Sequence, residues 1–317
     1  MPQLSEFLKF DLFAALMLTG IVQGIFLFFL LLPKKHRQPY HYLLLALLVL
    51  SFSLLVLEIF MGYTGLITQA LALVDFSEPL VFAIGPLTYL LIRSMSGRLF
   101  SRTDLLHFLP FLFYTAYHLL FLLEGGAVKY NAFLDAWHPD VAPVATATKF
   151  QQDPLYIRRN LEYFILLHIS LYMAVSLRWV NRQRNSSSGN PYFLSWVKVL
   201  IGFFGLSVLL YLVVRLSFQS DLGDHLMGVL LTLQLFFISY KMLTNSAFFQ
   251  PVVQQKYEKS TLSDENRQQV LERLQIAEQT KFYLQPSASL AGLASQLSTT
   301  PPLSVAGAQR KPGQELF

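Results

Sequence analysis

The sequence contains no cysteine, and charged residues make up only 14% of its 317 positions. Without cysteine the chain cannot form disulfides, use a thiolate nucleophile, or hold zinc or iron–sulfur clusters through thiolates. The scarcity of charge is equally informative, because hydrophobic residues reach 54% and aromatic residues 15%. Such a composition cannot cover a water-soluble globule with a charged surface, so we expect most of the chain to lie in lipid.

Motifs that mark common enzyme classes are also missing. The sequence has no G-x-x-x-x-G-K-[ST] phosphate loop, no G-x-G-x-x-G after a strand, no G-x-S-x-G elbow and no H-E-x-x-H helix. Its histidines show no metal-ligand spacing such as His-x-x-x-His. We therefore expect no enzyme activity, no cofactor and no metal site.

Hydrophobic runs with few or no charges recur along the first 245 residues. They occupy residues 12–32, 42–61, 79–92, 105–123, 163–177, 199–214 and 226–240. With its flanks, each run approaches the roughly 20 residues that an α-helix needs to cross a bilayer. The sequence therefore predicts an all-α protein with a seven-transmembrane-helix bundle at 1–245, surrounded by the lipid bilayer. The third run is the least regular, because Gly85 and Pro86 interrupt it.

Positive charges concentrate in alternate loops of this bundle. The first, third and fifth loops hold Lys34, Lys35, Arg37, Arg93, Arg98, Arg102, Arg178, Arg182 and Arg184. The second loop, at 62–74, has no basic residue. Short loops rich in lysine and arginine stay in the cytoplasm, so this alternation predicts an N-terminus outside and a C-terminus in the cytoplasm.

Several polar side chains fall within the predicted spans, where a charge is costly unless it is paired or hydrated. The candidates for ligand contact are Glu58, Glu78, His118, Glu162, His168 and Gln234. Two other interpretations stay open: the glutamates lie near the outer ends of their spans, where water reaches them, and the histidines can bridge helices as neutral hydrogen-bonded groups. A ligand pocket would lie at the outer ends of spans two to five and the loop 125–160, with Trp137 and Tyr156 as contacts.

A polar tail follows the seventh run, with a linker at 246–262 and a helical segment from 263 onward. Ser263 suits an N-cap, and acidic residues follow it in the first turn, where they complement the helix dipole. Apolar residues then fall on one helical face until Pro286 ends the helix. A second helical unit opens at Ser289, with apolar residues at i, i+3, i+4 and i+7.

Several short sequence motifs occur in a fixed order along the bundle and the tail. In order, these are Ile84-Gly85-Pro86-Leu87-Thr88-Tyr89-Leu90, Asp104-Leu105-Leu106-His107-Phe108-Leu109-Pro110, Lys256-Tyr257-Glu258-Lys259-Ser260, Lys281-Phe282-Tyr283-Leu284-Gln285-Pro286, Leu290-x-x-Leu293-Ala294-x-x-Leu297, Leu303-Ser304 and Lys311-Pro312-Gly313-Gln314. The pattern resembles the AraC/XylS-type transcription regulators, and in particular the membrane-anchored members in which a seven-helix sensor precedes a helix-turn-helix domain. The resemblance spans nearly the whole chain.

The resemblance implies a regulator in the inner (cytoplasmic) membrane of a bacterium, which senses an envelope or membrane signal and binds promoter DNA. Such domains contain two helix-turn-helix units, each with a recognition helix in the major groove. In the partial helix-turn-helix domain at 263–317, Ser304, Gln309 and Arg310 are the candidates for base contact, and Arg310 and Lys311 better suit phosphates. The second unit does not follow before Phe317, so we expect a truncated or frameshifted domain with impaired DNA binding. Half-site pairing would favour a homodimer.

Two other functions fit the same sequence. The protein could be a seven-span receptor or small-molecule transporter whose tail is vestigial. A membrane acyltransferase is a weaker third interpretation, which rests on Asp104 and His107 at the cytoplasmic side. DNA binding with steep salt dependence favours the regulator, and substrate uptake by reconstituted vesicles favours the transporter.

Overall fold

A computed structural model describes residues 7–32, 40–95, 98–151, 153–184 and 191–244, together with positions 272–273, 275–281, 289 and 292 of the tail. The chain divides into two units, Met1–Val252 and Val253–Phe317. The described residues form helices, turns and irregular segments, with no β-strand among them. The predicted all-α class is therefore confirmed for this part of the chain.

The first unit is a bundle of helices, and the connection between its fifth and sixth α-helices is long, at 138–160. Its α-helices are α1 (Leu12–Leu31), α2 (His41–Thr64), α3 (Val81–Met95), α4 (Leu109–Leu122), α5 (Gly126–Trp137), α6 (Leu161–Arg184), α7 (Pro191–Ser217) and α8 (Asp224–Thr244). The 3-10 helices η1 (Leu66–Gln69), η2 (Leu71–Leu73) and η3 (Glu78–Leu80) precede α3, and η4 (Arg102–Phe108) precedes α4. Within the described ranges, seven helical segments are long and apolar enough to cross a membrane, as in a multi-pass membrane protein.

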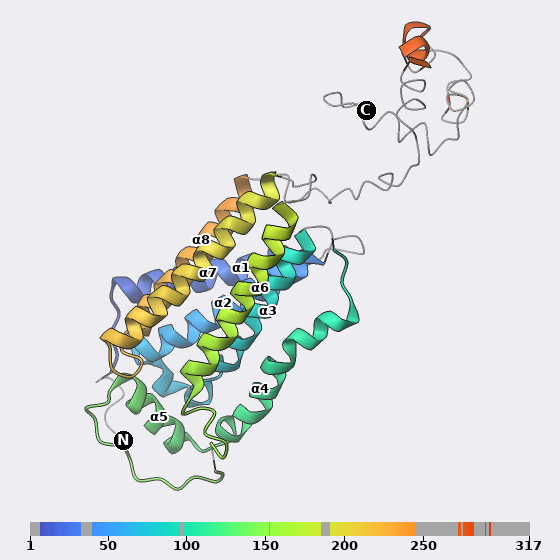
Figure 1. Cartoon of the computed structure of the whole chain (residues 1–317). Coiled ribbons are helices and arrows are strands. Elements are labelled where there is room, and N and C mark those ends of the chain that lie inside the picture. Colours follow the sequence, from blue (N-terminus) through green and yellow to red (C-terminus); the bar gives the residue numbers. More distant parts are fainter. Residues whose placement is uncertain are drawn as a thin grey trace. The chain divides into compact units, whose positions relative to one another are not determined.

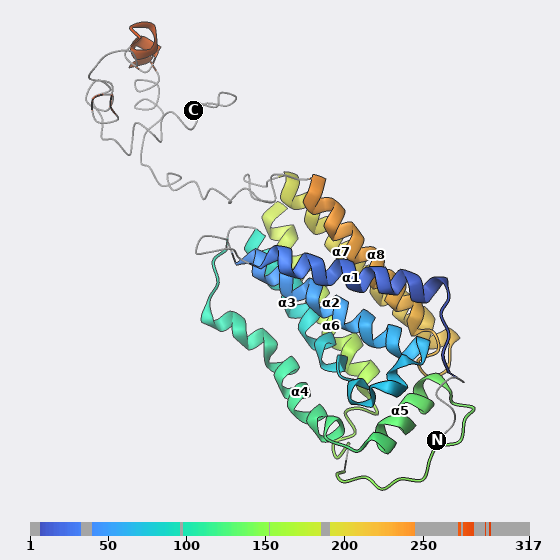
Figure 2. The ribbon, with the colours of Figure 1, turned by 180° about the vertical axis from the view of Figure 1, so that it is seen from behind.

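Helix α2 organises the bundle, because it packs against α1, α3 and α8. Figures 1 and 2 show α4 at the edge of the unit, apart from the other long helices. The main core lies between α1, α2, α3 and α8, where Met17, Leu45 and Leu235 are fully buried. The first residues of α1 and α8 lie at the same end of the bundle as α5, and α8 ends at the opposite end (Figure 1).

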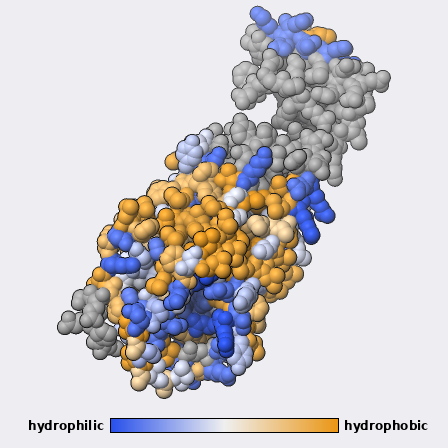
Figure 3. All heavy atoms as spheres, turned by 60° about the vertical axis from the view of Figure 1, so that its left-hand side comes forward, coloured by the Kyte–Doolittle hydropathy of each residue, from blue (hydrophilic) through white to orange (hydrophobic). Residues whose placement is uncertain are grey.

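Large apolar side chains also cover the outside of the helices. Phe26 is 61% exposed, Leu167 69% and Leu209 59%. Figure 3 shows a broad apolar surface over the helices, with hydrophilic side chains gathered in the lower part of the view. Soluble monomers rarely expose apolar patches this extensive, whereas a bilayer would remove this surface from water.

The N-terminal end of α1 is tied to the end of α2 through one carboxylate. Asp11 Oδ1 accepts a hydrogen bond from the Ala14 backbone N–H at 3.1 Å, as an N-cap does. The Tyr63 hydroxyl donates to Asp11 Oδ2 at 2.6 Å, and this bond holds the pKa of Asp11 below its ordinary value. Helix α2 then ends at Gly65, whose φ of 76° lies in the left-handed region that glycine adopts easily.

A buried ion pair joins α3 to η4 at the other end of the bundle. Arg93 Nη2 lies 3.0 Å from Asp104 Oδ1, and the two side chains are 5% and 2% exposed. Removing either partner would leave an uncompensated buried charge. His107 has a different partner, since its Nδ1 lies 3.0 Å from the Tyr172 hydroxyl. Asp104 and His107, the two residues named for an acyltransferase, therefore do not pair with each other.

The loop 125–160 contains a helix that the hydrophobic pattern does not reveal. Helix α5 places Val128, Phe133 and Leu134 in a second small core with Ile67 and Phe121. The third span also differs from its predicted bounds, because the segment before Val81 forms 3-10 turns. Pro86 lies inside α3 without ending it.

Only isolated parts of the tail are described. Residues 272–273 and 275–279 are helical, within the helix expected from 263 onward, and Ala277 is buried. Ser289 Oγ accepts a hydrogen bond from the Gly292 backbone N–H at 3.0 Å, the bond expected of an N-cap. The DNA-binding candidates Ser304, Gln309, Arg310 and Lys311 lie outside the described residues.

Close packing of α1 on its neighbours provides a test of the bundle. A Cβ at Gly24 would overlap Ser53 Oγ and lie 3.0 Å from Leu235 Cδ1. We expect Gly24→Leu to destabilise the chain by about 1–3 kcal/mol, because overpacking forces the helices apart. The midpoint of thermal unfolding in detergent measures this change. Gly202→Leu is the matched control, since nothing lies within 4 Å of a Cβ there; an equal loss in both variants would contradict the packing.

Candidate functional site

A cavity of about 480 Å³ lies within the bundle, toward the end where α2 ends and α6 and α8 begin. A volume of this size falls in the range of roughly 300–1,000 Å³ that small-molecule sites occupy. Its apolar lining includes Phe52, Ile165 and Leu231. The acidic and basic lining residues are Glu58, Asp75, Glu78, Asp135, Glu162, Asp221, Asp224, Arg158 and Arg215.

The position of the cavity can be compared with the pocket expected from the sequence. It lies at the predicted ends of spans two, three and five, but spans six and seven contribute to its lining in place of span four. The proposed contacts Trp137 and Tyr156 do not line it. Trp137 packs against Tyr63 with ring centroids 6.1 Å apart, and Tyr156 is 61% exposed.

One side of the cavity is built around Arg158. Its Nη2 lies 2.6 Å from Asp75 Oδ2, and its Nε lies 3.9 Å from Glu78 Oε2. The guanidinium also stacks over Phe121, with Cζ 3.9 Å from the ring centroid. Asp75 adopts a positive φ of 58°, which an aspartate tolerates better than most residues. The arginine therefore brings two carboxylates together that would otherwise repel each other.

His118 supports the same pair of acidic residues from α4. Its side chain is fully buried, with Nε2 2.8 Å from the Asp75 carbonyl oxygen and Nδ1 3.1 Å from Glu78 Oε2. Because a carbonyl oxygen only accepts, the hydrogen on Nε2 points to Asp75. Nδ1 and Glu78 Oε2 lie within ion-pair distance, but neither atom makes a hydrogen bond in the described structure. His118 thus bridges α4 to the segment before α3.

The connection before α6 positions Arg158. Asp153 Oδ1 accepts a hydrogen bond from the Arg158 backbone N–H at 3.0 Å, and Oδ2 accepts from the Arg159 N–H at 2.9 Å. The Tyr117 hydroxyl donates to the same carboxylate. Burial alone would raise the pKa of Asp153, but these hydrogen bonds outweigh it and hold the pKa below its ordinary value. A charged Asp153 therefore fixes the turn that carries Arg158.

Glu58 enters the cavity from α2 without a cation beside it. Its Oε2 accepts a hydrogen bond from the Ser77 backbone N–H at 2.8 Å and another from the Ser77 hydroxyl. No lysine or arginine among the described residues lies within ion-pair distance of Glu58. Among the described residues, the hydrogen bonds from Ser77 are therefore the polar contacts of this carboxyl group.

A second arginine gathers the other carboxylates. Arg215 near the end of α7 lies 3.3 Å from Glu162 Oε1, 3.0 Å from Asp221 Oδ1 and 3.5 Å from Asp224 Oδ2. Its Nη1 also donates to the Ser220 carbonyl oxygen at 2.7 Å. Asp224 Oδ1 is buried and has no hydrogen-bond partner in the described structure. One guanidinium therefore faces three carboxylates.

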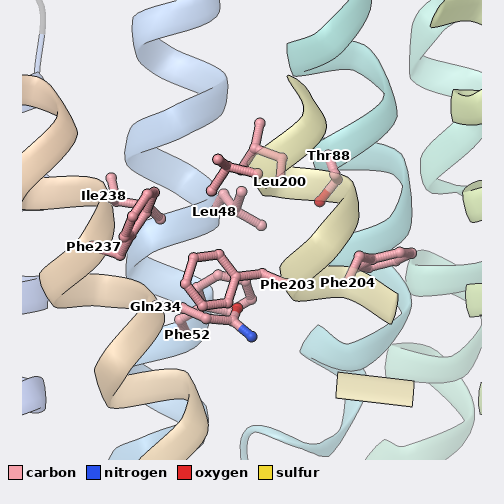
Figure 4. A pocket seen from close by; sticks show the side chains of 10 residues that line it. Leu48, Phe52, Thr88, Leu200, Phe203, Phe204, Gln234, Phe237 and Ile238 are labelled. Atoms are coloured by element: carbon pink, nitrogen blue, oxygen red, sulfur yellow. The ribbon is translucent and has the colours of Figure 1, made fainter. Parts of the chain in front are cut away.

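The cavity becomes apolar toward the middle of the bundle. Phe52, Phe204 and Gln234 line both this cavity and a smaller pocket of about 20 Å³ next to it. Figure 4 shows the residues of the smaller pocket converging from α2, α3, α7 and α8. Gln234 is 4% exposed, and its Nε2 donates to Ser207 Oγ at 2.8 Å. It is the deepest polar group of the cavity along α8.

Only some of the polar residues that the sequence offered as ligand contacts lie together in the structure. Glu58, Glu78 and Glu162 line the cavity, and His118 lies behind it against Glu78. Glu162 is 53% exposed, as expected for a group near the end of its span. His168 lies elsewhere, with its ring against Phe82 at 5.2 Å. Neither of its ring nitrogens has a hydrogen-bond partner in the described ranges, so the structure shows no hydrogen-bonded bridge between helices at His168.

The most informative members of the site were missing from the sequence candidates. Asp75, Arg158 and Asp224 lie just outside the predicted hydrophobic runs, where they read as ordinary loop charges. The sequence feature that could have pointed to them is an excess of acidic residues beside the outer ends of the predicted spans. Across the described residues, no group of three or more histidine or acidic side chains is arranged to hold a metal ion. The arrangement instead suits an organic ligand with polar and apolar parts.

The Arg158–Asp75 contact can be measured by a double-mutant cycle. Arg158→Gln should cost about 1–3 kcal/mol, less than for a fully buried pair, because the two side chains are 20% and 28% exposed. Adding Asp75→Asn should recover part of this loss, since the remaining charge disappears, and a coupling of at least about 1 kcal/mol is expected. Arg159→Gln is the control: this exposed neighbour makes no ion pair with any described residue. Additive losses in thermal unfolding would refute the pairing.

Comparison with models of protein families, with curated proteins and with solved structures finds no match to this chain. Function is therefore inferred from the geometry of the cavity and from the sequence pattern of the tail.

Proposed function

We propose that the chain is a membrane-bound transcription regulator, in which the helical bundle binds a small molecule and the tail contacts promoter DNA. The observation that supports the sensing role is the cavity of about 480 Å³, lined by charged groups from several helices. A ligand that bridges these helices favours one of their arrangements through its differential affinity. The likeness of the tail to AraC/XylS-type domains supports the DNA-binding role.

We further propose that the bundle lies in the inner membrane of a bacterium, with the N-terminus outside and the C-terminus in the cytoplasm. The basic residues in alternate loops support this orientation. The cavity would then lie toward the outside. Helix α8 contributes Asp224 and Gln234 to the cavity and ends at Thr244, beyond which the chain continues into the tail. Helix α8 therefore links the proposed ligand site directly to the segment proposed to bind DNA.

A small-molecule transporter is the second candidate, and the depth of the cavity favours it. Gln234 lies near the middle of α8, so the lining extends about halfway along this helix. Transporters commonly bind their substrates near the middle of the membrane. Uptake of a labelled substrate by vesicles that contain the chain, without promoter binding, would select this function.

DNA binding is tested with the full chain reconstituted in nanodiscs. Promoter fragments recovered with the chain by chromatin immunoprecipitation should bind it with an affinity that falls steeply as salt rises. Combining Arg310→Ala with Lys311→Ala should weaken binding to every fragment and reduce the slope of log K against log salt by about 2, because two phosphate contacts are lost. Lys256→Ala with Lys259→Ala removes the same charge from the linker and should have a smaller effect. Binding to promoter fragments no tighter than to random DNA would eliminate the regulator.

A further inference from the structure

Acidic groups outnumber basic groups among the residues that line the cavity. Seven carboxyl groups line it, against two guanidinium groups. A third cation, Lys129, does not line the cavity, and its ammonium group donates to the Ala72 carbonyl oxygen at 3.5 Å. Asp135 and Glu162 are exposed, so water reaches part of this charge, whereas like charges at the buried positions are unfavourable unless a proton, water or a cation neutralises or separates them.

Both guanidinium groups of the lining are already paired with carboxylates, although the Nε of each makes no hydrogen bond in the described structure. Arg158 pairs with Asp75 and stacks on Phe121, while Arg215 contacts Glu162, Asp221 and Asp224. An anionic ligand would have to displace one of these carboxylates before it met a positive charge. The cavity is therefore unsuited to phosphates, sulfates or carboxylates.

Two acidic residues that line the cavity have hydrogen-bonding capacity that the described residues do not use. Glu58 has only Ser77 as a hydrogen-bond partner, and Asp224 Oδ1 has no partner in the described part of the chain. An ammonium group has three N–H donors, which suit such acceptors. A cationic ligand would thus neutralise charge that the protein leaves uncompensated.

The apolar part of the lining sets a second requirement. Ile165, Ile169 and Leu231 line the cavity with Gln234 at its deeper part. The Gln234 side chain donates to Ser207, but its Oε1 accepts no hydrogen bond from any described residue, although the residue is 4% exposed. An inorganic cation held by the carboxylates would leave the apolar surface without a partner.

We infer that the cavity binds an organic amine with an apolar body. Its ammonium group lies among the carboxylates that include Glu58 and Asp224, and its apolar part packs toward Leu231, where Gln234 can accept a hydrogen bond from a second donor. This inference rests on the proposed sensing function of the bundle and adds the chemical class of the signal. Charge selects the ligand and the apolar surface contributes to its affinity.

A series of three indole compounds tests the inference on the unmodified chain. Tryptamine, tryptophol and indole-3-acetate share one ring system and differ in charge. With the full chain in nanodiscs of zwitterionic lipid, and empty nanodiscs as background, we expect saturable binding of radiolabelled tryptamine. Tryptophol should compete at least about tenfold more weakly, because it lacks the charge-assisted hydrogen bonds, and indole-3-acetate should not compete. Equal competition by tryptophol, stronger competition by indole-3-acetate, or no saturable binding of tryptamine would overturn the inference.

Conservative variants locate the binding. Glu58→Gln and Asp224→Asn should each weaken tryptamine binding about tenfold. Asp140→Asn removes an exposed carboxylate outside the cavity lining and should leave binding unchanged. Unchanged binding in both cavity variants would overturn the assignment. The two proposals fail separately: tryptamine binding without promoter occupancy supports the ligand class and rejects the regulator, whereas promoter occupancy without tryptamine binding does the reverse.

Discussion

Hydrocarbon cannot solvate an unpaired charge, and this constraint decides where the ionisable side chains of the bundle lie. Between α3 and η4, Arg93 and Asp104 neutralise each other with almost no exposure. At the opposite end, carboxylates outnumber guanidinium groups, and they line a cavity of about 480 Å³. One end of the bundle is therefore packed around a matched pair, and the other is hollow where charge is unmatched. The ligand site proposed for this protein lies at the hollow end.

The walls of the cavity depend on segments that are distant in sequence. Arg158 is held by Asp153 on its own turn, by Asp75 before α3 and by the ring of Phe121 at the end of α4. Movement of any one of these segments disturbs the other two, because they share a single guanidinium group. Arg215 joins α6, α7 and α8 in the same manner. The cavity is thus lined by two ion-pair clusters, each of which joins segments that are distant in sequence.

Hydropathy is enough to locate the seven spans, because each apolar run must be long enough to cross the bilayer. The same criterion misses α5, whose Lys129 and Asp135 dilute its apolar face, and whose packing partner Ile67 comes from a distant turn. Polar residues within spans flagged Glu58, Glu78 and Glu162, which do line the cavity. A search for polar residues within spans could not identify their partners, because Arg158 and Asp224 become neighbours of these glutamates only through tertiary packing.

Under the proposed function, the charge of the ligand is also what would turn binding into movement. Glu162 on α6 and Asp224 on α8 share Arg215, whereas Glu58 on α2 faces the same cavity with no cation beside it, so an ionised Glu58 favours separation of α2 from the other acidic groups when the cavity is empty. A bound ammonium group replaces this repulsion with attraction, whereas a neutral ligand of the same shape leaves it in place. The difference between the two states is then an electrostatic free energy, which is the differential affinity that a population shift requires. Because α8 carries Asp224 at one end and leads into the tail from the other, drawing Asp224 inward tilts the helix that the tail follows.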